Sequence, residues 1–196
     1  MEIKKANELD FDPREQMSRI FVEGFYDVAF KGISKDKNKL VEAFKDIFDL
    51  AHFYVGIENG KIATFVGVSD RRERINKLDK KAMRQQFGFL IGTLAYIGLK
   101  KEMLDKPYPF EMAKSSGSID FVSASPEFYG RGFTYQLIDH VIKTENYETY
   151  VLEVADPNPA AQNLYKKLGF KEFKRVPTKH AKRSGIDNLI YMERKK

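Results

Sequence analysis

Cysteine is absent from this 196-residue chain. Its absence excludes a disulfide-stapled scaffold and any zinc or iron–sulfur centre with cysteine ligands. It is also typical of a reducing compartment, and we expect a cytoplasmic protein. The chain has only three histidines, and the spacing of His52, His140 and His180 matches no metal-ligand pattern, so we expect no metal.

The chain also has little that could anchor it in a membrane. Its main apolar run, Phe87–Leu99, is too short to span a bilayer. We expect no membrane partner. Our first interpretation of this run is a buried helix, and the second is a contact between two subunits of a homodimer. Because a polar stretch, Glu2–Asp12, follows Met1, we expect no signal peptide.

The net charge of +6 is located at the end of the chain. Residues 166–196 carry eleven Lys and Arg against three Asp and Glu, whereas residues 1–165 have a net charge of −2. A solvated face, a small polyanionic ligand and nucleic acid could each explain this charge. Phe173 and Tyr191 could stack on bases in the last case. No recognition motif supports nucleic acid, and we do not expect it as a partner.

Apolar spacing predicts helices and strands in a mixed order. A stretch beginning at Ile3 could be a first strand. Two helices follow, the earlier starting at Asp12–Pro13 and the later capped by Ser34. A hairpin with the turn Asn59–Gly60 follows. The later elements are a strand at Ile119–Ala124, a helix from Phe133, a strand at Tyr150–Ala155, a helix at Pro159–Leu168, and strands at Phe170–Val176 and Leu189–Met192. With no repeat or long linker, we expect a single domain over residues 1–196.

A glycine turn joins the Ile119–Ala124 strand to the next helix. Gly130 and Gly132 allow a close approach of the backbone to a ligand, and the N–H groups at a helix start favour an anion. The turn matches neither a Walker A loop nor the dinucleotide-binding fingerprint. Alone, it can also be no more than a chain reversal.

A second motif follows about 25 residues later. Leu152-Glu153-Val154 lies near a strand end, and Asn158, Ala161, Tyr165 and Gly169-Phe170 come next. With both motifs in this order, residues 117–175 resemble the GNAT superfamily of acyl-CoA N-acyltransferases. The resemblance implies an α/β (α+β) fold: a mixed, mostly antiparallel central sheet with a splayed parallel strand pair and helices on both faces.

The resemblance also implies roles for single residues. It assigns acetyl-CoA as the co-substrate, Tyr165 as the acid near the cofactor sulfur and Glu153 as the base. The cofactor-binding residues that it implies are Val122, Ser123, Ala124, Gly130, Arg131, Gly132, Phe133, Thr134, Tyr135 and Asn158. Each has a plainer interpretation: Tyr165 could be a core residue, Glu153 a solvent-facing strand residue, and Asn158 only a helix cap.

Two positions depart from the family pattern. The motif Gln/Arg-x-x-Gly-x-Gly/Ala reads Tyr129-x-x-Gly132-x-Thr134 here, and Arg131 could supply the cation that Tyr129 lacks. Asp120 and Glu111 are alternatives to Glu153 as the base.

The function that the resemblance implies is transfer of an acetyl group to a primary amine of a small molecule or peptide. The alternative is an acyl-CoA-binding sensor or scaffold of the same fold without catalysis. In this fold, the acceptor cleft would be formed by Gly24–Ser34, with Phe25, Tyr26 and Phe30, and by Thr178–Asp187. The latter segment is basic, with Lys179, His180, Lys182 and Arg183, and favours an acceptor that carries a carboxylate or phosphate.

Overall fold

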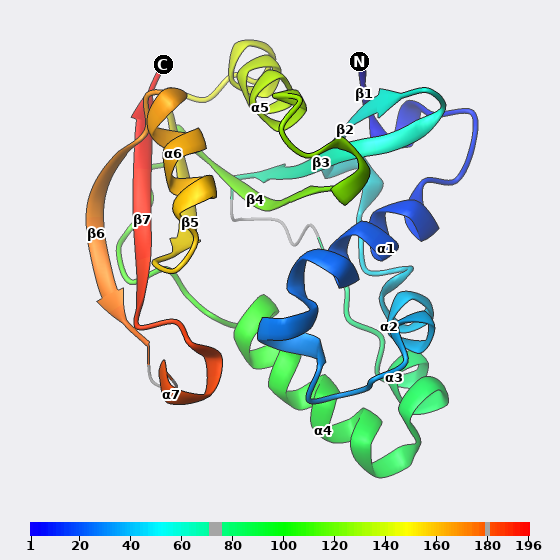
Figure 1. Ribbon diagram of the computed structural model, residues 1–196. Coiled ribbons are helices and arrows are strands. Elements are labelled where there is room, and N and C mark those ends of the chain that lie inside the picture. Colours follow the sequence, from blue (N-terminus) through cyan, green and yellow to red (C-terminus); the bar gives the residue numbers. More distant parts are fainter. Residues whose placement is uncertain (71–75, 179–180) are drawn as a thin grey trace.

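A seven-stranded sheet forms the centre of the computed structural model (Figure 1), in the order β1-β2-β3-β4-β5-β7-β6. The structure describes residues 1–70, 76–178 and 181–196. The strands are β1 (Glu2–Lys5), β2 (Phe53–Glu58), β3 (Lys61–Ser69), β4 (Ser116–Ala124), β5 (Thr149–Ala155), β6 (Lys171–Pro177) and β7 (Asn188–Lys195).

All neighbouring strands are antiparallel except β4 and β5, which are parallel. The parallel pair holds from Ser116↔Thr149 to Ile119↔Leu152 and goes no further, although both strands continue. The predicted mixed sheet with a splayed parallel pair is therefore confirmed.

Helices cover both faces of the sheet, as predicted (Figure 1). The α-helices are α1 (Arg14–Phe25), α2 (Lys37–Phe44), α3 (Lys80–Phe87), α4 (Phe89–Leu99), α5 (Phe133–Thr144), α6 (Pro159–Lys167) and α7 (Ala181–Ser184). Short 3₁₀ or π turns are η1 (Ala6–Glu8), η2 (Tyr26–Phe30), η3 (Leu50–His52), η4 (Lys100–Leu104) and η5 (Pro126–Phe128). Within the described ranges, no helix combines the length and the apolar character that a membrane crossing requires.

The core consists of two hydrophobic clusters, one on each face of the sheet. One lies under α1, α2 and the α3–α4 hairpin, and its aromatic centre includes Phe21, Phe44, Phe53 and Phe65. The other lies under α5 and α6 and contains Leu137, Ile138, Leu152, Tyr165 and Ile190. Residues 152 and 153 of β5 consequently face opposite sides, because side chains alternate along a strand.

Local sequence signals predicted the turn between β2 and β3 correctly, but they predicted the wrong cap for α2. Asn59 and Gly60 both have positive φ (52° and 73°), as expected for a tight turn between β2 and β3. The expected cap at Ser34 is wrong: Asp36 caps α2 and accepts the N–H of Asn38 and Lys39. Ser34 instead accepts the N–H of Asp36 at 3.0 Å. Serine and aspartate are both good helix caps, so the sequence does not distinguish between them. Here Ser34 forms a turn with Asp36, and the helix begins after that turn.

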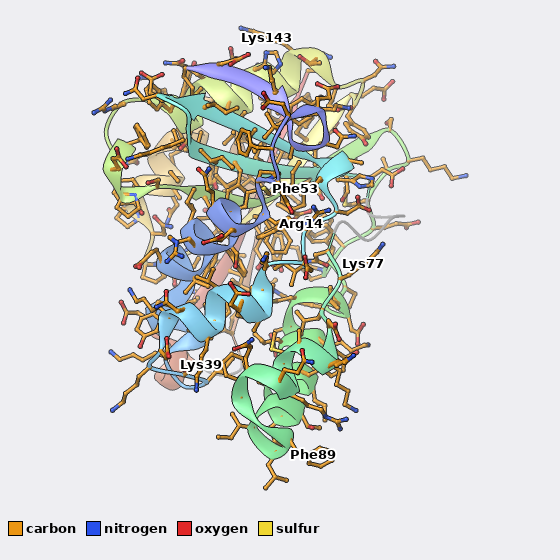
Figure 2. All side chains as sticks on the ribbon, turned by 90° about the vertical axis from the view of Figure 1, so that its right-hand side faces the viewer. Arg14, Lys39, Phe53, Lys77, Phe89 and Lys143 are labelled. Carbon is orange, nitrogen blue, oxygen red and sulfur yellow. The ribbon has the colours of Figure 1, made fainter. Side chains whose placement is uncertain are left out.

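The expectation of a buried helix at Phe87–Leu99 is wrong for this chain by itself. α3 and α4 form a hairpin that projects from the body, and Phe89 lies at its tip (Figure 2). One side of α4 packs on α3 and another on the first cluster, but five large side chains on its remaining side are more than half exposed: Phe89, Leu90, Ile91, Leu94 and Ile97. An apolar sequence indicates that a helix is buried against another surface, but it does not show that this surface belongs to the same chain.

Candidate active site at the splayed strands

The parallel strands β4 and β5 separate just beyond Ile119 and Leu152. The next residues, Asp120 and Glu153, are the first without a partner across this pair. β4 is also bulged here: the register to β3 shifts between Phe65 and Gly67, and Phe121 has φ +55°. A bulge bends the strand locally, which accounts for the separation.

The separation leaves the β5 side of β4 without strand pairing from Asp120 to Ala124. The N–H of Ser125 donates to Ala63 of β3 at 2.8 Å. Because successive N–H groups alternate in direction along an extended chain, that of Ala124 points the other way, toward β5. Ser123 is buried, and its Oγ has no hydrogen-bond partner in the described part of the chain. The groups that this edge offers to a ligand are thus its backbone N–H and C=O groups, since the Ser123 hydroxyl is buried.

The glycine turn follows this edge after the short turn η5. Gly130 (φ +78°) and Gly132 (φ +74°) both adopt the left-handed conformation, and Gly132 precedes the first residue of α5. No side chain among the described residues caps α5, so the N–H groups of its first turn have no partner within the helix. Arg131 is exposed beside them. The turn therefore has the geometry of an anion site.

Thr134, one of the two departures from the family pattern, has a structural role. Its hydroxyl oxygen lies 3.2 Å from that of Thr64, a buried residue of β3 whose own hydroxyl donates to the carbonyl of Ser123. The contact ties the start of α5 to the sheet. Tyr129, the other departure, has 62% of its surface exposed.

Tyr165 lies on α6 in the second cluster, with only 5% of its surface exposed. Two predicted cofactor-binding residues, Val122 and Tyr135, pack against the same cluster. Burial raises the pKa of the Tyr165 hydroxyl above its ordinary value of 10.0. The hydroxyl therefore stays protonated near neutral pH and can donate a hydrogen bond.

Glu153 lies on the opposite face of β5 and is held by two donors. Lys106 Nζ is 2.9 Å from Oε1 and 2.8 Å from Oε2, and the hydroxyl of Tyr191 donates to Oε2 at 2.7 Å. The carboxylate is about one third exposed. No hydrogen bond or ion pair between described residues joins Glu153 to Tyr165.

The alternative bases differ in their surroundings. The hydroxyl of Ser118 donates to Asp120 on the same strand. Glu111 is exposed and lies outside the strands. Asp120 and Glu153 share a sheet face, because each is the next residue after a matched pair of the parallel register.

Asn158 is a helix cap, as its plainer interpretation predicted. Its side-chain oxygen accepts the N–H of Ala161 at 3.0 Å at the start of α6. The neighbouring Asp156 accepts the backbone N–H of Asn188 at 2.8 Å and that of Asp187 at 3.2 Å. These bonds fix the β5–α6 loop against the start of β7.

The two segments expected to form the acceptor cleft are only partly described. Phe25 and Tyr26 are partly buried, whereas Phe30 is fully buried in the core and cannot contact an acceptor. Lys179 and His180 lie outside the described residues, as do the side chains of Lys182 and Arg183. Tyr191 is also buried, with its ring against Tyr108 and Phe110, which excludes the stacking role that a nucleic-acid function would need.

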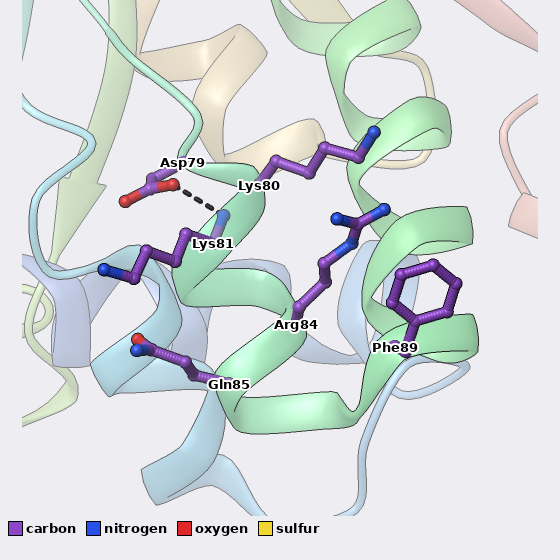
Figure 3. Close-up of a pocket in the computed structure, with 6 residues that line it drawn as sticks. All are labelled: Asp79, Lys80, Lys81, Arg84, Gln85 and Phe89. Atoms are coloured by element: carbon purple, nitrogen blue, oxygen red, sulfur yellow. Dashed lines mark hydrogen bonds between the residues drawn. The ribbon is translucent and has the colours of Figure 1, made fainter.

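A pocket of about 560 Å³ lies away from these groups, on the α3–α4 hairpin (Figure 3). Its lining is Asp79, Lys80, Lys81, Arg84, Gln85 and Phe89. In the parts of the chain that are described, no group of three or more His, Asp and Glu residues could hold a metal ion.

Sequence reasoning missed two residues of this region, Lys106 and Thr64. Lys106 lies between α4 and β4, next to Pro107 and outside both motifs. It reaches Glu153, 47 positions later, because residues 106–110 run beside β7 and β6: Phe110 packs against Phe173, and Lys174 donates to the carbonyl of Pro109. No sequence spacing could indicate this contact.

Comparisons with known proteins agree with this geometry. Residues 15–170 match the model of the acetyltransferase (GNAT) family. An N-acetyltransferase from Staphylococcus aureus Mu50 is similar in fold, with a TM-score of 0.67 at 15% identity over 99% of this chain and 100% of that one. A GNAT-family acetyltransferase from Bacillus cereus ATCC 10987 has a TM-score of 0.58 at 12% identity, over 100% and 96%.

The ribosomal-protein-S18-alanine N-acetyltransferase of Escherichia coli has a TM-score of 0.53 at 15% identity, over 98% of this chain and 91% of that one. No curated protein matches the sequence.

Proposed function

Because the chain belongs to the acetyltransferase (GNAT) family, we propose that it transfers an acetyl group from acetyl-CoA to a primary amine. One observation carries the proposal: the unpaired edge of β4 leads, through the short turn η5, into the glycine turn and the start of α5. The edge at Val122–Ala124 would pair with the pantetheine amides, and the N–H groups of Gly130–Tyr135 would bind the pyrophosphate. Asn158 would contribute only by fixing the loop beside the arm.

In the proposed reaction the amine nitrogen attacks the thioester carbonyl carbon. The carbon–sulfur bond breaks, and the thiolate leaves. Backbone N–H groups at the separated edge of β4 would stabilise the oxyanion. No covalent intermediate with the protein is needed, in keeping with the absence of cysteine.

Tyr165 would donate to the departing sulfur. A thiol has a pKa of about 8.5, lower than that of the buried tyrosine hydroxyl. A hydrogen bond from the hydroxyl to the thiolate is consequently favoured over complete proton transfer, and the thiol proton comes finally from solvent. This role needs a tyrosine that remains protonated, and burial has that effect.

Glu153 would accept the proton that the amine loses, directly or through water. Lys106 and Tyr191 hold the carboxylate in one orientation. The Lys106 ammonium would also disfavour a second cation beside it, so that the acceptor would react as the neutral amine. Asp120 shares this face and remains the alternative base.

Turnover with a panel of amines tests the proposal. Since the chain has no cysteine, a thiol reagent detects only the coenzyme A that is released. The panel should contain polyamines, amino acids, amino sugars and a peptide with an N-terminal alanine, because one structural neighbour is named for an alanine acceptor. We expect amine-dependent release, lost in Glu153→Gln and partly recovered at higher pH, where more of the amine is neutral.

Binding of acetyl-CoA without turnover of any amine would instead support the non-catalytic sensor or scaffold. A Glu153→Gln variant with full activity at neutral pH would transfer the base role to Asp120. Absence of acetyl-CoA binding would reject both functions.

A further inference from the structure

The outer side of α4 is an apolar surface for which the described chain supplies no cover. Leu90, Leu94 and Ile97 follow one another at helical spacing, and Phe89 and Ile91 flank them. Leu94 has 71% of its surface exposed. The five side chains, each more than half exposed, together present apolar surface on the order of 500 Å². That is at the upper end for a monomer.

The rest of α4 is held firmly in place by its own chain. A Cβ on Gly92 would lie 2.4 Å from the carbonyl oxygen of Met83, which shows how closely α4 approaches α3. Arg84 Nε donates to the hydroxyl of Thr93 at 2.9 Å, and the guanidinium lies over the ring of Phe89 at 4.3 Å. The apolar surface is therefore presented by a rigid hairpin.

We propose that this surface is the interface of a homodimer in which α4 pairs in antiparallel orientation with α4 of a second copy. In such a pair the same surface serves both copies, and Leu94, the middle residue of α4, lies next to the two-fold axis. About 500 Å² of apolar surface, extended by the rim of α3, approaches the ~800 Å² per partner of a standard interface.

The distribution of charge fits this arrangement. α4 contains no charged residue, as expected for the centre of an interface. Of the basic side chains of the pocket (Figure 3), Arg84 lies over Phe89 at the start of α4, whereas Lys80 lies over Tyr96 near its end. An antiparallel pair places opposite helix-dipole ends side by side.

The same features argue against a membrane surface as the occupant. An interfacial helix has one apolar and one strongly charged face, whereas α4 is apolar around its whole circumference. Such a helix is typical of a protein interior, which a second copy would supply. The proposal does not depend on the proposed acetyl transfer.

The oligomeric state in solution tests the proposal, by light scattering after size exclusion from about 1 to about 100 µM. We expect a dimer for the wild type, and for Leu94→Glu a dissociation constant raised roughly 30-fold or more. Phe11→Glu is the matched control, because Phe11 is an exposed aromatic residue before α1. It should remain dimeric. A monomeric wild type, or a Leu94→Glu variant that dimerises as well as the control, would overturn the proposal.

A second measurement avoids any loss of folding caused by the charge. The chain has no cysteine, so Leu94→Cys introduces a single thiol. A short bismaleimide should link two copies of Leu94→Cys and leave Phe11→Cys as single chains. Failure to link the former contradicts the antiparallel pairing. If the wild type is monomeric and floats with anionic vesicles, the apolar surface of α4 binds a membrane and not a second copy.

Discussion

Lys106 Nζ lies 2.8 Å from Oε2 of Glu153, although the two residues are 47 positions apart. The pair is only partly buried, so its own contribution to stability is small, about 0–1 kcal/mol. Its importance lies in orienting the carboxylate that we propose as the base. Any effect of Lys106 on the reaction can therefore be measured without loss of the fold.

We predict that Lys106→Met lowers kcat severalfold and leaves the KM for acetyl-CoA unchanged, because among the described residues Glu153 then keeps only the Tyr191 hydroxyl as a donor. Lys106→Arg should recover part of the loss, since it restores a cation with planar geometry. Steady-state kinetics on an accepted amine measure both variants. Unchanged kcat in Lys106→Met would show that Glu153 needs no orienting cation.

Gly132→Asp should abolish acetyl-CoA binding, because it places a carboxylate at the anion site and strains the backbone. Gly60→Asp is the matched control: Gly60 also has positive φ and open space around it, but lies in the β2–β3 turn. Each variant should lose about 1–2 kcal/mol from the strain. Only Gly132→Asp should lose thermal stabilisation by acetyl-CoA. Equal stabilisation in both variants would exclude the glycine turn as the cofactor site.

Tyr165→Phe should lower kcat about 10²-fold or more, the usual effect of losing one transition-state donor. Because the ring still packs in the second cluster, affinity for acetyl-CoA should hardly change. Calorimetry of binding and turnover on the same preparation separate the two effects. If Tyr165→Phe keeps full turnover, a water molecule must donate the hydrogen bond to the departing sulfur in place of Tyr165.

The fold should lose stability above about pH 10. Burial raises the pKa of Tyr165, and burial together with the Glu145 carboxylate raises that of Tyr54. A group whose pKa is raised on folding contributes stability below its unfolded pKa and loses that contribution as the pH rises through the folded value. Urea midpoints at pH 9 and 11 should therefore differ less in Tyr165→Phe than in the wild type. Equal differences would mean that Tyr165 does not resist ionisation.

Much of the candidate site was predictable because its geometry is local in the chain. Gly130 and Gly132 stand between a strand and a helix, where only a positive φ allows the reversal, and both have it. The Asn158 cap and the inward position of Tyr165 follow equally from neighbours a few residues away. The sequence by itself therefore determined the order of the strands and helices from β4 to α6, the glycine turn and the family.

Tertiary structure alone decided the contacts that join distant segments. Thr134 departs from the family pattern, and its partner Thr64 lies 70 positions away across the sheet. Lys106 reaches Glu153 only because residues 106–110 run beside β7 and β6. The exposed side of α4 was also decided by the tertiary structure. The composition of this helix indicated that it should be buried, but the side that is buried depends on the directions in which the helices and strands pack. Those directions follow from the whole core and not from any local pattern.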